Sequence, residues 1–221
     1  MSEVLDPKEL SYEDGVFLVK LARKAIYEYL AHGKRIKPPE NTPKHLMKKG
    51  AAFVTLETYL DGRYELRGCI GFIKPVAPLV DTVINSAIAA STEDPRFPPM
   101  TLSELSNVTV EVSVLSVPEL IKAKGYDIVK EVTIGYHGLI VQLGVFSGIL
   151  LPVVPVEYCW DVETFLAETC LKAGLSPDCW LSPKVQIFRY YAATFKEVKP
   201  EGDVVFRDLT KEYKEKCRWV T

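Results

Sequence analysis

The sequence contains no apolar run of the roughly 20 residues that a membrane-spanning helix requires. Residues 1–10 are acidic and polar and lack the basic start and apolar stretch of a secretory signal. Neither sign of charge dominates, because 27 Lys and Arg residues stand against 29 Asp and Glu residues, for a formal net charge of -2. Such a chain is not drawn as a whole to phosphate backbones. We therefore expect a cytoplasmic protein without membrane contact or general nucleic-acid binding. The overall charge does not exclude a local basic groove.

Cysteine is present, but not in the spacing of a metal or redox motif. None of the cysteines forms a C-x-x-C pair. No histidine lies near the three in residues 159–179, which argues against a zinc site. We expect no metal and no cofactor. In a reducing compartment all the cysteines should be free thiols, namely Cys69, Cys159, Cys170, Cys179 and Cys217.

The size and composition of the chain are those of an ordinary globular protein. Its 221 residues are 48% hydrophobic and 25% charged, which suits one large domain or two small ones. A chain of this length buries about 70% of its unfolded surface. Its stability therefore requires neither a metal nor a disulfide.

Helical and strand patterns are interspersed along the sequence. Apolar residues at helical spacing predict helices over residues 11–33, 78–91 and 161–172, with a short helix starting near Thr101. β-branched and aromatic residues predict a hairpin over residues 51–60 and 63–73 that turns at Asp61 and Gly62. Further strands are expected at residues 108–114, where alternation predicts half burial, and at residues 131–134, 139–143, 148–154 and 185–198.

This order of elements predicts an α+β fold with mostly antiparallel sheets flanked by helices. Residues 1–221 are expected to form a single domain that can divide into two lobes. Residues 117–144 would belong to a smaller lobe inserted in the middle. Residues 1–116 and 145–221 would form the larger lobe.

The best candidate for a functional site is the segment from Leu66 to Gly71, which reads LRGCIG. Gly68 and Gly71 are poor strand formers that permit close approach of another backbone. Cys69 lies between them. An unperturbed thiol with a pKa of about 8.5 is only about 3% thiolate at pH 7, whereas a pKa of about 6.5 would make it mostly thiolate. The alternative is that Cys69 is a small core hydrophobe, as most free cysteines are.

A second candidate is the proline-rich segment 94–99, which reads DPRFPP. Its prolines hold Asp94, Arg96 and Phe97 at fixed spacing, so the loop could orient an anion or a carboxylate. Equally, an ion pair between Asp94 and Arg96 and a buried Phe97 could lock the loop for structural reasons alone.

Two further residues are weaker candidates. His137 could act as a general base, but Gly-Tyr-His-Gly between two expected strands is typical of a hairpin turn. Glu157 follows an apolar run and could lie at the mouth of a cleft. A lone carboxylate is, however, more often a solvated surface group.

The sequence resembles the AMMECR domain family, whose hallmark is the hexapeptide found here at residues 66–71. Four further blocks match in order: DPRFPP at 94–99, GLIV at 138–141, SGILLP at 147–152, and a stretch that begins with Trp160 and Asp161 and ends in KAGL at 172–175. The resemblance covers nearly the whole chain. One departure is Val153, where the family usually has Gln, so no role is assigned to an amide at that position.

The resemblance implies an α+β fold with a larger part built from both chain ends and a smaller middle part. It implies no established activity. The family occurs from archaea to animals and has been suspected of a basic housekeeping role, with the hexapeptide regarded as its site.

Two hypotheses of different class follow. In the first, the protein is an enzyme that uses Cys69 as a thiolate nucleophile, with Arg96, Asp94 or His137 positioned by the fold. In the second, it is a binding or regulatory module for a small ligand or protein partner. The sequence favours the second, because it holds no complete triad, metal set or phosphate-loop motif. The candidate binding residues are Arg67, Gly68, Gly71, Asp94, Arg96 and Glu157. The sequence specifies neither the ligand nor the oligomeric state.

Overall fold

The computed structural model describes residues 3–219 and confirms the α+β class. The chain divides into two compact units. Unit 1 comprises the residues up to Val117 and Ala193–Arg207, and unit 2 comprises Pro118–Ala192 and the residues from Asp208 onward. The sequence predicts that all of residues 145–221 lie in one lobe. In the structure the chain passes between the units within strand β7 (Gln186–Glu197) and again before helix α5 (Leu209–Lys216).

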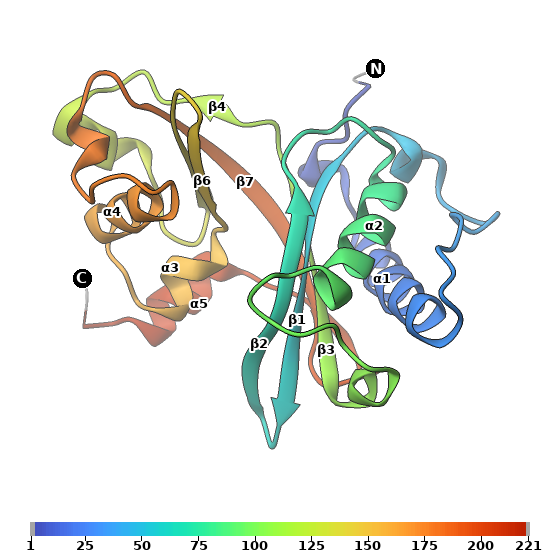
Figure 1. Cartoon of the computed structure of the whole chain (residues 1–221). Helices are drawn as coiled ribbons and strands as arrows, with labels where there is room; N and C mark the ends of the chain where they lie inside the picture. The colour runs from blue at the N-terminus through green and yellow to red at the C-terminus, as the bar shows by residue number, and fades with distance from the viewer. Residues whose placement is uncertain (1–2, 220–221) are drawn as a thin grey trace. The chain divides into compact units, whose positions relative to one another are not determined.

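Unit 1 is a sheet with two helices on one face (Figure 1). Strands β2 (Arg63–Phe72), β1 (Ala51–Leu60) and β3 (Val108–Leu115) lie side by side in that order and pair antiparallel. The second half of β7 follows β3, and β8 (Val204–Phe206) pairs with β7. Helix α1 (Tyr12–His32) packs on β3, and α2 (Leu79–Thr92) packs on β1 and β2. Three short 3-10 helices complete the unit: η1 (Pro7–Glu9), η2 (Lys44–Met47) and η3 (Leu102–Asn107).

Local sequence explains where the main elements of unit 1 begin and turn. Helix α1 starts at a capping box, in which Ser11 Oγ accepts from the Asp14 N–H at 3.1 Å and the Asp14 carboxylate accepts from the Ser11 N–H at 2.9 Å. It ends at Gly33, whose φ is 65°. Asp61 and Gly62 have φ of 49° and 84°, as a two-residue hairpin turn requires. The predicted helix and hairpin are confirmed.

Strand β3 differs from the expectation of a half-buried strand, because all of its residues are buried. Its valines pack toward the helices in the core of unit 1. Its polar residues are bonded within the protein: Ser113 shares a 3.0 Å hydrogen bond with Thr194, and Glu111 accepts one from Arg207 Nη1 at 2.8 Å. Polar groups are tolerated inside a protein when each has a partner, so alternation alone did not reveal this burial.

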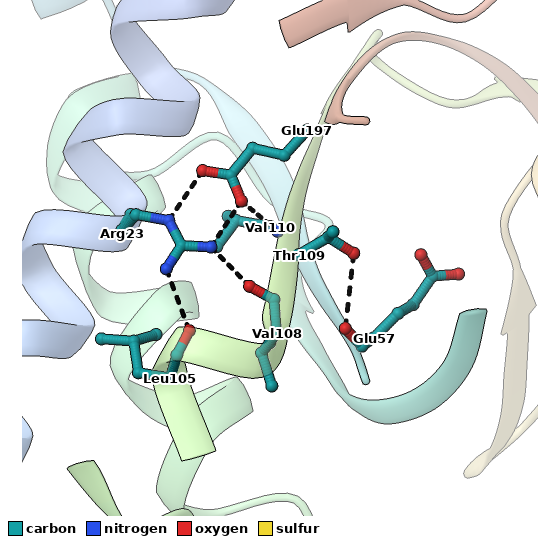
Figure 2. A network of polar contacts seen from close by, with 7 residues as sticks. All are labelled: Arg23, Glu57, Leu105, Val108, Thr109, Val110 and Glu197. Atoms are coloured by element: carbon teal, nitrogen blue, oxygen red, sulfur yellow. Dashed lines mark hydrogen bonds and ion pairs between the residues drawn. The ribbon is translucent and has the colours of Figure 1, made fainter. Parts of the chain in front are cut away.

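A largely buried arginine, Arg23, joins three parts of unit 1 (Figure 2). Arg23 Nε donates to Glu197 Oε1 at 2.7 Å, and Arg23 Nη1 donates to the Leu105 carbonyl at 3.1 Å. Arg23 Nη2 donates to the Val108 carbonyl and to Glu197 Oε2. The same Glu197 oxygen accepts from the Val110 N–H at 3.0 Å. The side chains of Arg23 and Glu197 are 13% and 3% exposed, so this is a largely dehydrated ion pair.

Breaking this ion pair should destabilise unit 1. We expect Glu197→Met to lower the free energy of unfolding by about 3–5 kcal/mol, because a buried guanidinium is left without its counter-charge. The double variant Arg23→Met/Glu197→Met should lose less than the sum of the single variants. Urea denaturation measures both. A loss in Glu197→Met below about 1 kcal/mol, the range of an exposed pair, would contradict the expectation.

Unit 2 is a second antiparallel arrangement of strands with helices. The first half of β7 pairs with β4 (Glu119–Leu120) and with β5 (His137–Leu143), and β5 pairs with β6 (Phe146–Leu150). Helix α4 (Val162–Lys172) packs on β5 and β6, and α3 (Val153–Glu157) packs on α5. The 3-10 helices η4 (Gly125–Glu131) and η5 (Cys179–Leu181) also belong to this unit.

Three predictions in unit 2 are wrong. Residues 131–134 form no strand, because η4 runs to Glu131. The carbonyl oxygen and the carboxylate of Glu131 both accept from Arg189 Nη1 at 2.7 Å. The strand expected at residues 148–154 ends at Leu150, where Pro152 starts the turn into α3. The hairpin turn expected around His137 is a turn at residues 134–136, and His137 itself opens β5.

The expectation of free thiols throughout is wrong for four cysteines. Cys159 is disulfide-bonded to Cys217, and Cys170 to Cys179, whereas Cys69 is free. The bonded partners are 58 and 9 residues apart in sequence. Such spacing carries no motif, so only the fold reveals that the turn after α3 meets the end of α5.

Among the helices within residues 3–219, none combines the length and apolar character that crossing a membrane requires.

Candidate functional site

The LRGCIG segment lies in β2, the edge strand of the unit 1 sheet. The strand contains a bulge at this point. Gly68 pairs with Leu56 and Leu66 pairs with Glu57, so Arg67 has no partner residue in β1. A bulge of this kind bends its strand and changes the direction of the side chains.

The two glycines of the segment are required by close packing. A Cβ on Gly68 would lie 2.1 Å from the carbonyl oxygen of Ala90 in α2, and a Cβ on Gly71 would lie 2.3 Å from the ring of Phe53. Gly68 therefore lets β2 contact the end of α2 directly. The close approach of another backbone that the sequence predicts for these glycines is therefore present, and it serves the packing of the protein itself.

The loop after α2 is attached to the segment through Asp94. Asp94 Oδ2 accepts a hydrogen bond from the Cys69 N–H at 2.8 Å. Arg96 Nε and Nη2 donate to the two carboxylate oxygens at 2.9 and 2.7 Å, and Nη2 also lies 3.5 Å from the Cys69 carbonyl oxygen. A carboxylate and a guanidinium thus bind the outward-facing backbone groups of an edge strand, as another strand would.

The charges of Asp94 and Arg96 stabilise each other. The Arg96 hydrogen bonds, assisted by the Cys69 N–H, hold the pKa of Asp94 down to about 2. Asp94 in turn raises the pKa of Arg96. The Asp94 side chain is 2% exposed and the Arg96 side chain is 46% exposed. The expected ion pair is therefore present, with its carboxylate buried and its guanidinium at the surface.

Phe97 contacts two guanidinium groups. The Cζ atoms of Arg67 and Arg96 lie 5.8 and 5.5 Å from its ring centroid, within cation-π range. Arg67 donates to Glu104 Oε1 and to the Pro98 carbonyl, both at 3.0 Å. The expected burial of Phe97 is only partial. The Arg67 side chain is 12% exposed, so Arg96 is the more accessible of the two guanidinium groups.

The Cys69 thiol contacts a neighbouring strand. Thr55 Oγ1 donates to Cys69 Sγ at 3.2 Å. Thr55 pairs with Cys69 on one side and with Glu111 on the other, so the three residues form a row across β2, β1 and β3. Cys69 is partly exposed as a residue, but burial still raises the pKa of its thiol to about 11, although Thr55 and Arg96 act in the opposite direction. At pH 7 only about one thiol in ten thousand is then ionised.

Sequence reasoning missed a set of charged residues on this face of the sheet. Lys196 forms an ion pair with Glu57, and its Nζ lies 3.7 Å from the ring centroid of Tyr64. Arg207 forms an ion pair with Glu111, whose pKa is raised by burial. The sequence signal for Glu111 is its polar position among alternating valines in residues 108–114, but alternation predicts that such a position faces solvent.

The two weaker candidates lie in unit 2, whereas residues 66–71 and 94–99 lie in unit 1. His137 Nδ1 accepts from the Thr133 N–H at 3.0 Å, and burial, with Arg189, lowers the pKa of His137 to about 4. The imidazole is therefore neutral at pH 7. Glu157 is exposed at the end of α3, and its carbonyl accepts from Lys216 Nζ at 2.7 Å.

The depressed pKa of Asp94 predicts a pH-dependent contribution to stability. Its folded pKa of about 2 lies below the ordinary 3.8, so the contribution is complete above about pH 4 and is lost as the pH falls toward 2. We expect Asp94→Asn to lower the free energy of unfolding by about 2 kcal/mol at pH 7. Urea unfolding of both proteins from pH 7 to pH 2 measures this. A difference between them that did not change with pH would contradict it.

Comparison with known proteins agrees with the motifs. The AMMECR1 family model matches residues 19–195, which is more than half of the chain. The chain belongs to the AMMECR1 family. The resemblance seen in the sequence is thereby confirmed.

Archaeal relatives in the AMMECR1 family match along most of the chain. Protein PYRAB00100 of Pyrococcus abyssi is 52% identical over 198 residues, covering 89% of this chain and 97% of the relative. Protein MJ0810 of Methanocaldococcus jannaschii is 49% identical over 201 residues, covering 90% and 98%. The crystal structure of uncharacterised protein PH0010 from Pyrococcus horikoshii matches with a TM-score of 0.86 and 48% identity, covering 93% of this chain and 99% of that one.

Proposed function

We propose that this AMMECR1-family protein is a binding or regulatory module. Its recognition surface would consist of residues 66–71 and 94–99 of unit 1. The surface would accept a small ligand or a protein partner that presents an anionic group. The observation that carries this proposal is Arg96, a guanidinium fixed by Asp94 with its side chain still 46% exposed.

The chemistry of the loop suits recognition of an anion. Asp94 and the Cys69 carbonyl contact Nε and Nη2 of Arg96, so a ligand would approach through Nη1. Guanidinium groups bind carboxylates and phosphates well. Phe97 beside Arg96 offers an apolar face for a neighbouring part of the ligand. Because the loop is already ordered by these bonds, binding would require little further ordering.

The enzyme hypothesis is less well supported. A nucleophilic cysteine requires a lowered pKa or an adjacent base, and burial instead raises the pKa of Cys69 to about 11. Its neighbour Thr55 donates to the sulfur and is not a base. Cys69 then serves recognition by holding Asp94 through its backbone N–H.

The binding proposal is tested by substitution of Arg96. We expect acetate, succinate, citrate and inorganic phosphate, titrated into 15N-labelled protein, to shift amide signals of residues 66–71 and 94–99. Arg96→Ala should weaken binding of the anion with the highest affinity about tenfold or more, which corresponds to about 1.4 kcal/mol, because the guanidinium is lost.

Arg35→Ala is the matched control for this test. Arg35 is similarly exposed, at 41%, and is ion-paired with Asp81 at 2.7 Å, so its loss should leave binding unchanged. If no anion shifted these signals, or if Arg96→Ala bound as well as the parent protein, the proposal would be wrong.

The state of Cys69 can be measured directly, because the other four cysteines are in disulfides. Without reductant, iodoacetamide should modify Cys69 slowly at pH 7, and the rate should rise about tenfold per pH unit toward the pKa of about 11. Mass spectrometry of the labelled protein follows this rate. A rate that levels off below about pH 8 would revive the enzyme hypothesis.

We also propose that the protein acts in the cytoplasm. Disulfides are rare there, but intracellular proteins of hyperthermophilic archaea and bacteria are an exception. The relatives from Pyrococcus come from such organisms. On this proposal the two disulfides are compatible with an intracellular protein.

A further inference from the structure

Helix α5 is poorly suited to hold its place in unit 2 by packing alone. It has eight residues and reads LTKEYKEK, of which only Leu209 is buried. Helices this short are marginal in water without tertiary contacts. Its position therefore depends on specific attachments to the rest of the unit.

Two attachments involve the carbonyl groups at the end of α3 and in the turn that follows. Lys216 Nζ donates to the Glu157 carbonyl at 2.7 Å, and Tyr213 Oη donates to the Trp160 carbonyl at 2.9 Å. The last carbonyls of a helix lack partners within the helix, and a lysine there also suits the helix dipole. These bonds are polar and can be exchanged for bonds to water.

The start of α5 contacts the turn before His137. A Cβ built on Gly135 would lie 2.5 Å from the Leu209 carbonyl oxygen, so the helix lies directly on that turn. Removal of α5 would uncover this turn and the carbonyl groups after α3.

A further attachment is covalent. The disulfide between Cys159 and Cys217 joins the turn after α3 to the residue that follows α5, and closes a separation of 58 residues. Cys217 is 1% exposed, but Cys159 is partly exposed. In the other disulfide both residues are buried, with Cys170 at 0% and Cys179 at 7% exposed, and only 9 residues separate them.

We propose that the Cys159–Cys217 disulfide is a redox-sensitive clasp on α5, which a dithiol reductant of the thioredoxin class opens. A reductant thiolate attacks Cys159 Sγ, the bond to Cys217 Sγ breaks, and Cys217 leaves as a thiolate that takes up a proton. The second reductant thiol then attacks the mixed disulfide and releases the Cys159 thiol. Two electrons and two protons pass from the reductant, which becomes a disulfide. Helix α5 then leaves unit 2, whose strands stay folded.

The test uses the full oxidised chain, titrated with dithiothreitol and then with a thioredoxin. Differential alkylation with mass spectrometry identifies the opened disulfide, and hydrogen exchange by peptide follows α5 and strands β5 and β7. We expect Cys159 and Cys217 to be alkylated while Cys170 and Cys179 are still bonded. Exchange of residues 209–217 should then rise about tenfold or more, as expected for a released segment, without change in the strands. Reoxidation should restore protection.

Two double variants separate release of α5 from general loss of stability. Cys159→Ser/Cys217→Ser should show fast exchange in α5 without reductant, whereas Cys170→Ser/Cys179→Ser should keep α5 protected until reductant is added. Unchanged protection of α5 after both thiols are alkylated would overturn the proposal. Loss of protection in α5 and the strands together, or earlier opening of Cys170–Cys179, would overturn it as well.

Discussion

The Arg23–Glu197 ion pair is the interaction on which unit 1 depends, because it joins α1 to β7 and also binds the chain around β3 (Figure 2). A guanidinium with several donors can satisfy one carboxylate and two carbonyl groups at once. This pairing brings the beginning of the chain and its late strand into one unit. The sheet that results carries β2 at its edge, and with it the LRGCIG segment.

The candidate site at the edge of that sheet is also held by charged side chains that bind backbone groups. Asp94 and Arg96 bind the backbone of Cys69 from outside, and Arg67 binds Glu104 and Pro98. Gly68 allows α2 to approach closely enough for the loop after α2 to reach β2. The backbone and the small residues of the motif therefore provide most of its contacts with the loop after α2 and with α2 itself. Its cysteine thiol accepts a hydrogen bond from Thr55, but burial outweighs this contact and raises the pKa of the thiol.

The two units use different means to hold their last elements. In unit 1, buried ion pairs and a well-packed core fix β7 and β8, and Arg207 at the end of the unit binds Glu111. In unit 2, the polar helix α5 is fastened by a disulfide and by hydrogen bonds to carbonyl groups. The covalent attachment compensates for the weak packing of α5, in which only Leu209 is buried. This contrast underlies the proposal that reduction of Cys159–Cys217 releases α5.

The sequence by itself determined what short-range physics controls. Capping at Ser11, positive φ at Asp61 and Gly62, and hydrophobic periodicity fixed α1 and the β1–β2 hairpin. The ordered motifs also placed the chain in its family. The tertiary structure alone decided the disulfide partners and the burial of polar residues such as Glu111. These depend on partners far apart in sequence, as Glu111 and Arg207 are, and local pattern carries no information about such pairs.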